Sequence, residues 1–211
     1  KVSIVQCKDY EVNKVYEAIK KALDLIGYKI KPNQKVLIKP NLLQVDDPHG
    51  PITTNPIIVD AICKILKEKD CKIFIGDSSA YETGKALDKC GIKAVAEKNK
   101  ATLLNFDAYP VVKIKNSENK ILKKFYISKI AKEVDLIINV PKLKTHVLTK
   151  YTGAVKNLYG FIPGGAKSQY HAITKTPENF SLLLIELYKY IKPGLSIMDA
   201  IVGMEGEGPS A

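Results

Sequence analysis

The chain has 211 residues, of which 45% are hydrophobic and 26% are charged, as in ordinary globular proteins. No apolar run approaches the roughly 18 residues that a membrane span needs, so we expect a soluble, cytoplasmic protein without membrane contacts. The formal net charge is +11, and all 33 basic residues are lysines dispersed along the chain. Because recognition of phosphates and base edges favours clustered arginines, nucleic acid is not an expected partner.

The N-terminal part of the chain alternates short apolar runs with amphipathic stretches, which is the pattern of βαβ units. Gly27 can end the first helix, and Asn55 can cap the helix that Pro56 begins. In chain order we predict a strand over Val2–Gln6, a helix over Glu11–Ile26, a strand over Lys35–Lys39, a helix from Pro56 to about Lys69, a strand over Cys71–Ile75 and a helix near Glu82–Lys89.

The middle of the chain is less regular, and the main pattern then resumes. We predict a short helix over Gly91–Asn99, strands over Ala101–Asn105 and Val111–Lys115, a turn at Asn116–Asn119, and a strand over Lys124–Ile127. Further along we predict a strand over Asp135–Val140, a helical stretch from about Lys150, a helix over Glu178–Tyr190 opened by Pro177, and a strand over Leu195–Met198.

These elements predict one α/β domain over residues 1–211, built on a mostly parallel sheet with helices on both faces. The short strands in the middle predict a β-rich insertion over residues 101–128. The glycine-rich segment from Gly203 to Pro209 follows a predicted strand and stops abruptly. Since loops after strands commonly position a ligand, we expect the chain to continue beyond Ala211.

The four cysteines are Cys7, Cys63, Cys71 and Cys90. They lack the close paired spacing of a zinc site and the cysteine run of an iron–sulfur protein. We therefore expect reduced, structural thiols, and we expect any iron–sulfur cluster to lie outside this chain.

Ligands of open parallel sheets bind beyond the carboxyl ends of the strands. The polar and glycine residues of this chain concentrate in four loops at such ends: Lys39–Asn41, Gly76–Ser79, Pro141–Gly165, and the segment from Asp199 onward. This concentration predicts a ligand site formed by these loops.

The third of these loops carries the residues best suited to chemistry. Histidine exchanges protons near neutral pH, which makes His146 a candidate acid or base. A partly buried lysine can act as a nucleophile or hold a covalent adduct, which is the role considered for Lys156. Gly153 would let a helix start approach an anion closely. The alternative is structural: Thr145 and Thr149 cap a helix, His146 packs locally, and the lysines are solvated.

Two further positions carry candidate site residues. Asp77 follows a predicted strand, where it either binds a metal or a ligand hydroxyl or caps the next helix. His49, beside Asp46 and Asp47, fits either a metal site or a solvated loop, and we favour the loop.

Together these arguments give a predicted site. Its catalytic residues are His146, Lys156 and Asp77. Its ligand-binding residues are Lys39, Asn41, Ser78, Ser79, Lys142, Lys144, Thr145, Thr149, Thr152, Gly153 and Asn157.

Four segments together resemble a known family: KVLIKPNL from Lys35, GDSSAYET from Gly76, NVPKLKTHVLTKYTGAVKNLYG from Asn139 and DAIVGMEGEGP from Asp199. They are similar to the family catalogued as domain of unknown function 362, and the resemblance covers almost the whole chain. Members of that family are often associated with iron–sulfur clusters carried by a separate ferredoxin-like module.

The order of residues around His146 also resembles the nickel-pincer lactate racemases. In that family a histidine stands ten residues before the lysine that bears the cofactor, as His146 stands before Lys156 here. The resemblance implies that His146 is an acid or base, that Lys156 is the attachment point, and that His171 is a metal ligand. The second acid/base histidine of the racemases is replaced by Asp77, so a shared scaffold and cofactor pocket are the expected features.

The sequence therefore predicts an enzyme that binds a small organic acid or anionic cofactor and performs proton-transfer or redox chemistry. The alternative is a non-catalytic module whose basic surface docks with an electron carrier or a partner protein. The two hypotheses differ in geometry: an enzyme requires His146 and Lys156 in one concave pocket, whereas a docking module requires a flat basic face.

Overall fold

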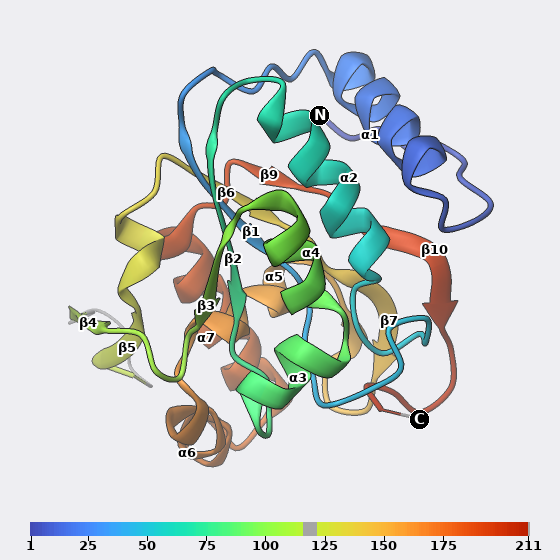
Figure 1. Cartoon of the computed structure of the whole chain (residues 1–211). Coiled ribbons are helices and arrows are strands. Elements are labelled where there is room, and N and C mark those ends of the chain that lie inside the picture. The colour runs from blue at the N-terminus through green and yellow to red at the C-terminus, as the bar shows by residue number, and fades with distance from the viewer. Residues whose placement is uncertain (116–121, 211) are drawn as a thin grey trace.

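The computed structural model describes residues 1–115 and 122–210, and its centre is a five-stranded sheet (Figure 1). The strands are all parallel and lie in the order β3-β2-β1-β6-β9. They are β1 (Lys35–Lys39), β2 (Lys72–Asp77), β3 (Thr102–Asn105), β6 (Leu136–Asn139) and β9 (Leu195–Ser196). The α/β class predicted from the sequence is confirmed.

The inner residues of the central strands are mainly apolar, as expected for a parallel sheet covered on both faces. In β1, Val36 and Ile38 belong to one hydrophobic cluster, whereas Leu37 belongs to the other. In β6, Ile138 and Ile137 divide between the two clusters in the same way. Successive side chains of a strand point to opposite faces, so a continuous apolar run can serve two cores at once.

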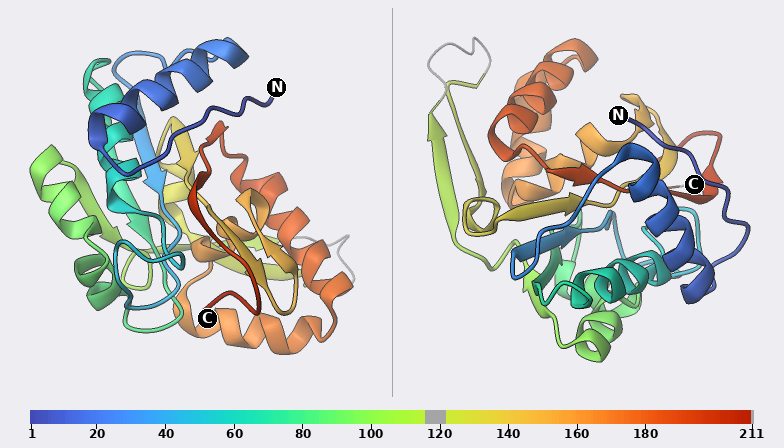
Figure 2. Two further views of the ribbon diagram at one scale, coloured as in Figure 1. Left: turned by 90° about the vertical axis from the view of Figure 1, so that its right-hand side faces the viewer. Right: turned by 90° about the horizontal axis from the view of Figure 1, so that it is seen from above.

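Helices cover both faces of the sheet, as predicted (Figure 2). One face carries α1 (Val12–Ile26), α2 (Pro56–Lys67), α3 (Thr83–Lys89) and α4 (Ile92–Asn99). The other carries α5 (Ala154–Asn157), α6 (Gly164–Thr174) and α7 (Pro177–Ile191), with short 3-10 turns at Lys129–Lys132 and Leu158–Phe161. The helix ends obey the expected rules: the Asn55 side chain accepts a hydrogen bond from Ile57 N at 2.9 Å, and Gly27 ends α1 with a φ of 67°.

Two smaller sheets flank the main one. β7 (Lys142–His146) pairs with β10 (Asp199–Met204) and with β8 (Lys150–Thr152). β4 (Val111–Lys115) and β5 (Lys124–Ser128) form an antiparallel pair that projects from one side of the molecule (Figure 1). Because β3 joins the main sheet beside β2, the antiparallel excursion begins at Val111, and the strand at residues 102–105 is not part of it.

Other predicted elements need correction. Val2–Gln6 is not a strand: none of the strands in the described residues pairs with it, and Val2 and Ile4 are 90% and 93% exposed. The helix predicted from about Lys150 is wrong: residues 150–152 pair with β7, and the short helix α5 begins only at Ala154. The predicted turn at residues 116–119 lies outside the described residues.

A helix that crosses a bilayer must be both long and apolar. No helix in the described part of the chain meets both conditions.

Candidate functional site

A cavity of about 220 Å³ lies at the carboxyl ends of β1 and β2. Its wall is formed by the loops after these two strands, by β7 and β8, and by α5 and α6. The predicted site residues that line it are Lys39, Asn41, Asp77, Ser78, Lys144, His146, Thr152, Lys156, Asn157 and His171. His146 and Lys156 therefore face the same concave pocket.

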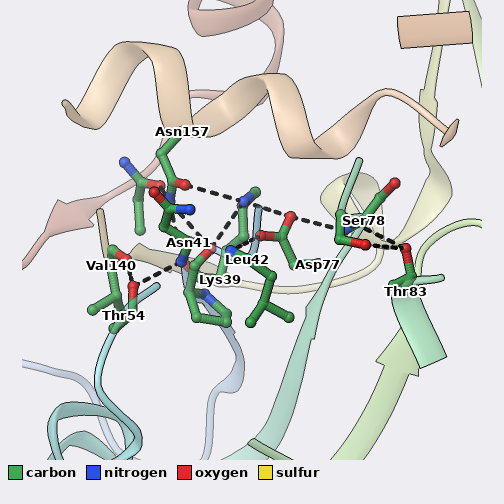
Figure 3. A network of polar contacts seen from close by, with 12 residues as sticks. Lys39, Asn41, Leu42, Thr54, Asp77, Ser78, Thr83, Val140 and Asn157 are labelled. Carbon is green, nitrogen blue, oxygen red and sulfur yellow. Dashed lines mark hydrogen bonds and ion pairs between the residues drawn. The ribbon is translucent and has the colours of Figure 1, made fainter. Parts of the chain in front are cut away.

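The floor of the cavity holds a buried ion pair between the last residues of β1 and β2 (Figure 3). The Lys39 ammonium lies 2.7 Å from Asp77 Oδ1, and the two side chains are 0% and 2% exposed. Burial lowers the pKa of Lys39, and the charge of Asp77 opposes this effect. Asp77 also accepts hydrogen bonds from Leu42 N at 2.9 Å and Ser78 N at 2.8 Å. Both of its oxygens thus take part in holding Lys39 and two backbone turns.

Gly160 closes over this ion pair and leaves no room for a side chain. A Cβ at residue 160 would lie 2.1 Å from Asp77 Oδ1 and 2.6 Å from Lys39 Nζ. Real Cβ atoms do not approach other atoms so closely, so only glycine permits the approach of this backbone to the pair.

Lys156 contributes a free amine to the cavity. Among the described residues, no hydrogen bond or ion pair involves its Nζ atom; the nearest recorded partners are the rings of Tyr159 at 5.8 Å and Phe180 at 5.7 Å. Burial lowers the pKa of Lys156 to about 8. An amine with this pKa is partly unprotonated near neutral pH and can accept a proton or attack an electrophile.

Two more lysines present positive charge to the cavity. Lys144 Nζ donates to Ile52 O at 2.8 Å, and burial followed by the charge of Lys156 lowers its pKa to about 7. Lys167 Nζ donates to the carbonyl oxygens of Ser78 and Ser79 and to Ser78 Oγ, and burial lowers its pKa to about 8. No carboxylate of the described residues lies within ion-pair distance of either ammonium, so each retains net positive charge when it is protonated.

His146 is held as a neutral imidazole. Its Nδ1 accepts hydrogen bonds from Leu148 N at 3.1 Å and Thr149 N at 3.4 Å. Burial and then the charges of Lys156 and Lys144 lower its pKa to about 4. Because Nδ1 is an acceptor in these bonds, the single proton of the neutral ring resides on Nε2. At neutral pH His146 can therefore donate one hydrogen bond to a ligand.

His171 lies on the wall formed by α6. Its ring stacks on Phe180 with centroids 4.3 Å apart and meets the edge of Tyr159 at 5.1 Å. Burial and the charge of Lys156 lower the pKa of His171. Over residues 1–115 and 122–210, no three histidine, cysteine or acidic side chains are grouped as metal ligands, so a metal here would need ligands from a bound cofactor.

Two buried polar groups on the wall lack a partner. Asn41 Oδ1 and Thr152 Oγ1 have no hydrogen-bond partner within the described ranges, although their residues are only 6% and 5% exposed. Buried polar atoms are normally satisfied, and an unsatisfied one on a cavity wall is a natural contact for a ligand or a bound water.

The remaining predicted binding residues do not line the cavity: Ser79, Lys142, Thr145, Thr149 and Gly153. Lys142 instead forms a separate buried cluster, with Asp199 at 2.9 Å and Tyr10 Oη at 2.8 Å. The hydroxyl of Thr149 donates to Tyr151 O at 3.1 Å. The Lys142–Asp199 pair thus joins β7 to β10, whereas the Ser79 hydroxyl donates to Tyr81 O within the loop after β2.

Lys167 and Asp107 are site residues that the sequence reasoning missed. Lys167 lies on the cavity face of α6 with Gly164, Ser168 and His171, at spacings that a predicted helix would have placed together. Asp107 accepts hydrogen bonds from Thr83 Oγ1 at 2.5 Å, from Gly164 N at 2.7 Å and from Ser78 Oγ. Burial opposes ionisation of Asp107, but these hydrogen bonds outweigh it and keep its pKa below the usual value. No local signal marked Asp107, which lies two residues beyond the end of β3.

Comparisons with known proteins place this geometry in context. The model of the family described as "Domain of unknown function (DUF362)" matches residues 36–211. The thylakoid-associated protein sll1697 of Synechocystis sp. is 33% identical over 217 residues, a match that covers 99% of this chain and 65% of the relative. The chain thus spans about two thirds of the length of this curated relative.

The lactate racemase apoprotein from Thermoanaerobacterium thermosaccharolyticum has a similar fold. The superposition has a TM-score of 0.50 at 20% sequence identity and covers 87% of this chain and 48% of the racemase. At this identity the similarity shows a shared fold.

Proposed function

The chain belongs to the family described as domain of unknown function 362, and from this premise we propose that it is an enzyme that binds a small organic acid in the cavity and moves a proton on it. The observation that carries the proposal is the position of Lys156: a half-buried amine without a hydrogen-bond partner in the described chain, in the same cavity as a neutral histidine donor. An enzyme needs its proton acceptor and its hydrogen-bond donor to converge on one pocket, and these two groups meet that requirement.

The lysines give the acid its binding energy and lower the cost of charge on it. Lys144 supplies an ammonium donor for the carboxylate, and Lys167 adds positive charge behind Ser78. In a cavity that is partly screened from solvent such charges act more strongly than in bulk water. Cationic walls of this kind are how proteins stabilise the enolate that forms when a proton leaves the carbon beside a carboxylate.

The proposed step is proton abstraction. The unprotonated Lys156 amine takes the proton from the carbon beside the carboxylate, and the electron pair of the broken C–H bond moves onto the carboxyl group. His146 Nε2–H donates a hydrogen bond to the oxygen that gains charge, and Lys144 offsets the additional charge. Return of the proton from the Lys156 ammonium to carbon restores the resting amine, so atoms and charge balance over the cycle.

The test is exchange of the carbon-bound proton in deuterated water, followed by proton NMR. Purified protein is incubated with single organic acids such as lactate and malate, and loss of the α-proton signal is timed. Lys156→Ala should slow the exchange by about 10²–10⁴-fold, the usual contribution of a general base. Lys21→Ala, which removes an exposed lysine of α1 outside the cavity, is the matched control and should leave the rate unchanged. Exchange that survives in Lys156→Ala at the original rate would refute the assignment of the base.

A covalent nickel-pincer cofactor would use part of the same wall. The residues fit the attachment: Lys156 presents a free amine for a covalent bond, and His171 presents an imidazole to the same cavity. When bound, such a group would supply a metal centre for redox chemistry on the substrate. Asp77 could not replace the second acid/base histidine in that chemistry, because its oxygens are occupied by Lys39 and two backbone amides.

Intact mass spectrometry with nickel analysis, on protein purified without oxygen, separates these roles of Lys156. A base must be a free amine, so the mass of the unmodified polypeptide is the expected result. An adduct that disappears in Lys156→Ala would establish attachment and exclude this lysine as the base.

A further inference from the structure

We propose that Asn139, the last residue of β6, is a positioning residue that fixes the helical turn α5 and thereby sets the place of Lys156 in the cavity. This inference rests on the proposed function, because it names the residue through which the proposed base is held. Asn139 itself does not line the cavity, so it acts through α5. Hydrogen bonds from its side chain to both ends of this turn carry the inference.

The turn α5 (Ala154–Asn157) is too short to hold its own position. It has four residues, about one turn of helix, and isolated helices are marginal even at about 12–15 residues. Its N-cap is Gly153, which has no side chain to cap the first amides of the turn. Contacts outside α5 must therefore fix the backbone from which Lys156 projects.

One buried amide side chain bridges the two ends of the turn. Asn139 is 0% exposed, and its Nδ2 donates to the carbonyl oxygen of Ala154, the first residue of α5, at 2.9 Å. Its Oδ1 accepts a hydrogen bond from Asn157 Nδ2, on the last residue of α5, at 2.8 Å. Lys156 lies between these two anchored residues. An amide is suited to this role because it offers a donor and an acceptor side by side.

The direction of these hydrogen bonds is dictated at both ends of the network. An ammonium group can only donate, so Lys39 Nζ, 3.5 Å from Asn157 Oδ1, turns that oxygen toward itself and leaves Nδ2 for Asn139 (Figure 3). A backbone carbonyl can only accept, so the oxygen of Ala154 faces Asn139 Nδ2. The network thus has one consistent arrangement, which ties α5 to the buried pair of Lys39 and Asp77.

Asn139 is itself held by the centre of the main sheet. Its backbone pairs with Lys39 in the parallel register of β6 and β1, and its carbonyl oxygen accepts a hydrogen bond from Ile197 N at 2.9 Å. A functional group is placed most precisely when the residues that support it stand on rigid elements. The sheet thereby determines where the Lys156 amine stands.

Loss of this support should change the acidity of Lys156. In its present place burial lowers the pKa of the amine to about 8. The ionisable groups that line the cavity with it are Lys144 and His146 of β7, Lys167 and His171 of α6, Tyr159, and the mutually neutralising pair of Lys39 and Asp77. A displaced turn would let water reach the amine and return its pKa toward the usual value near 10.4. At pH 7 the unprotonated fraction would then fall from about one tenth to about 1 in 2,500, a decrease of about 200-fold.

The test is the pH profile of proton exchange in Asn139→Leu, a variant of similar size whose side chain has neither donor nor acceptor. Exchange on lactate and malate in deuterated water is timed from about pH 6 to about pH 10 in the variant and in the intact protein. We expect the midpoint of the profile to rise from about 8 by at least about one pH unit, and the rate at pH 7 to fall at least about tenfold.

Asn99→Leu is the matched control. Asn99 is also buried, and its Nδ2 donates to Asp60 Oδ1 at 2.6 Å and to Val95 O at 2.9 Å, outside the cavity wall. This variant loses a comparable set of hydrogen bonds and should keep the midpoint of the intact protein. An unchanged midpoint in Asn139→Leu, whatever its rate, would overturn the inference.

A measurement without substrate keeps the test decisive. The pKa of Lys156 can be read by NMR from the Cε signal of its side chain, which is identified by its loss in Lys156→Arg. A raised pKa in Asn139→Leu, without exchange of either acid by the intact protein, would support the positioning role and overturn the proposed function. Exchange by the intact protein, together with the same Lys156 pKa in both proteins, would overturn the positioning role and leave the proposed function standing.

A second variant covers the case in which Asn139→Leu fails to fold. The hydroxyl of Asn139→Thr is one bond shorter than the amide, so it cannot bridge both ends of α5. This variant should raise the pKa of Lys156 in the same direction, and an unchanged pKa would overturn the inference.

Discussion

Removal of the Asp77 carboxylate should strongly destabilise the fold, because it leaves the Lys39 ammonium buried without a counter-ion. In the intact protein these groups lie 2.7 Å apart, and the lysine side chain is 0% exposed. In Asp77→Ala the lysine must either stay charged with only the neutral oxygens of Pro40 and Asn157 as partners or lose its proton. Removal of the proton from a lysine at pH 7 costs about 1.4 kcal/mol for each unit by which the pH lies below the normal pKa near 10.4. This cost sets a ceiling of about 5 kcal/mol on the loss.

Measured losses on breaking buried ion pairs, about 3–5 kcal/mol, agree with this ceiling. The variant also leaves the amides of Leu42 and Ser78 without their acceptor. Because the adjoining cavity can admit water to these amides, we expect a total loss of about 3–5 kcal/mol in the free energy of unfolding at pH 7.

The loss should shrink as the pH rises. In Asp77→Ala the folded-state pKa of Lys39 lies below its unfolded value, so the unfolded chain binds more protons between those two pKa values. Stability therefore increases with pH in that window, up to about pH 10.4. Urea unfolding at pH 7 and pH 9.5 measures both the loss and its pH dependence.

Two comparisons make the experiment specific to the buried pair. Asp88→Ala removes an exposed carboxylate 3.7 Å from Lys93 and should cost less than about 1 kcal/mol. Lys39→Met in the Asp77→Ala background removes the unpaired charge and should recover much of the lost stability. A loss in Asp77→Ala no larger than that in Asp88→Ala would refute the argument from burial.

Three further predictions concern single groups. Gly160→Ala should lower the free energy of unfolding by at least about 1–3 kcal/mol in urea titrations, because its Cβ would overlap the buried ion pair; unchanged stability would contradict this. Tyr10→Phe should cost about 1–3 kcal/mol by the same method, since it leaves Asp199 without a hydrogen bond of 2.7 Å. Nitrogen-detected NMR should find His146 neutral, with its proton on Nε2, until the pH falls to about 4; a titration near pH 6.5 would show that the imidazole is solvated.

The sequence predicted the main sheet well because its signals are local and consistent. Strands such as β1 have a continuous apolar run between their end residues, and helices such as α2 carry both a cap and a proline at the expected positions. The failures share one physical cause. Lys150–Thr152 forms a strand only because it pairs with β7, a contact that depends on tertiary structure and leaves no periodic signal in three residues.

The candidate site was predictable in part for the same reason. Residues that end a parallel strand, such as Lys39 and Asp77, must meet at one edge of the sheet, so sequence position suffices to group them. Which lysines carry free charge was not predictable. Lys142 and Lys144 are two residues apart on β7, yet Lys142 is paired with Asp199, whereas Lys144 faces the cavity. The partner of Lys142 comes from a segment far away in the sequence.

The engagement of Asp77 leads to a last prediction, on stereochemistry. Inversion at carbon requires a proton acceptor on each side of the substrate, and Asp77 is the carboxylate that lines the cavity. Asp77 is an ion-paired carboxylate that accepts two amide hydrogen bonds, and Lys167 has committed its donors to the loop after β2. With Lys156 as the base that we propose, the proton returns to the face from which it came. We expect deuterium to enter L-malate without formation of the D isomer, which chiral chromatography of the exchanged acid can measure. Equal loss of configuration and of the α-proton would show that a second base acts in the cavity and that the ion pair opens during the reaction.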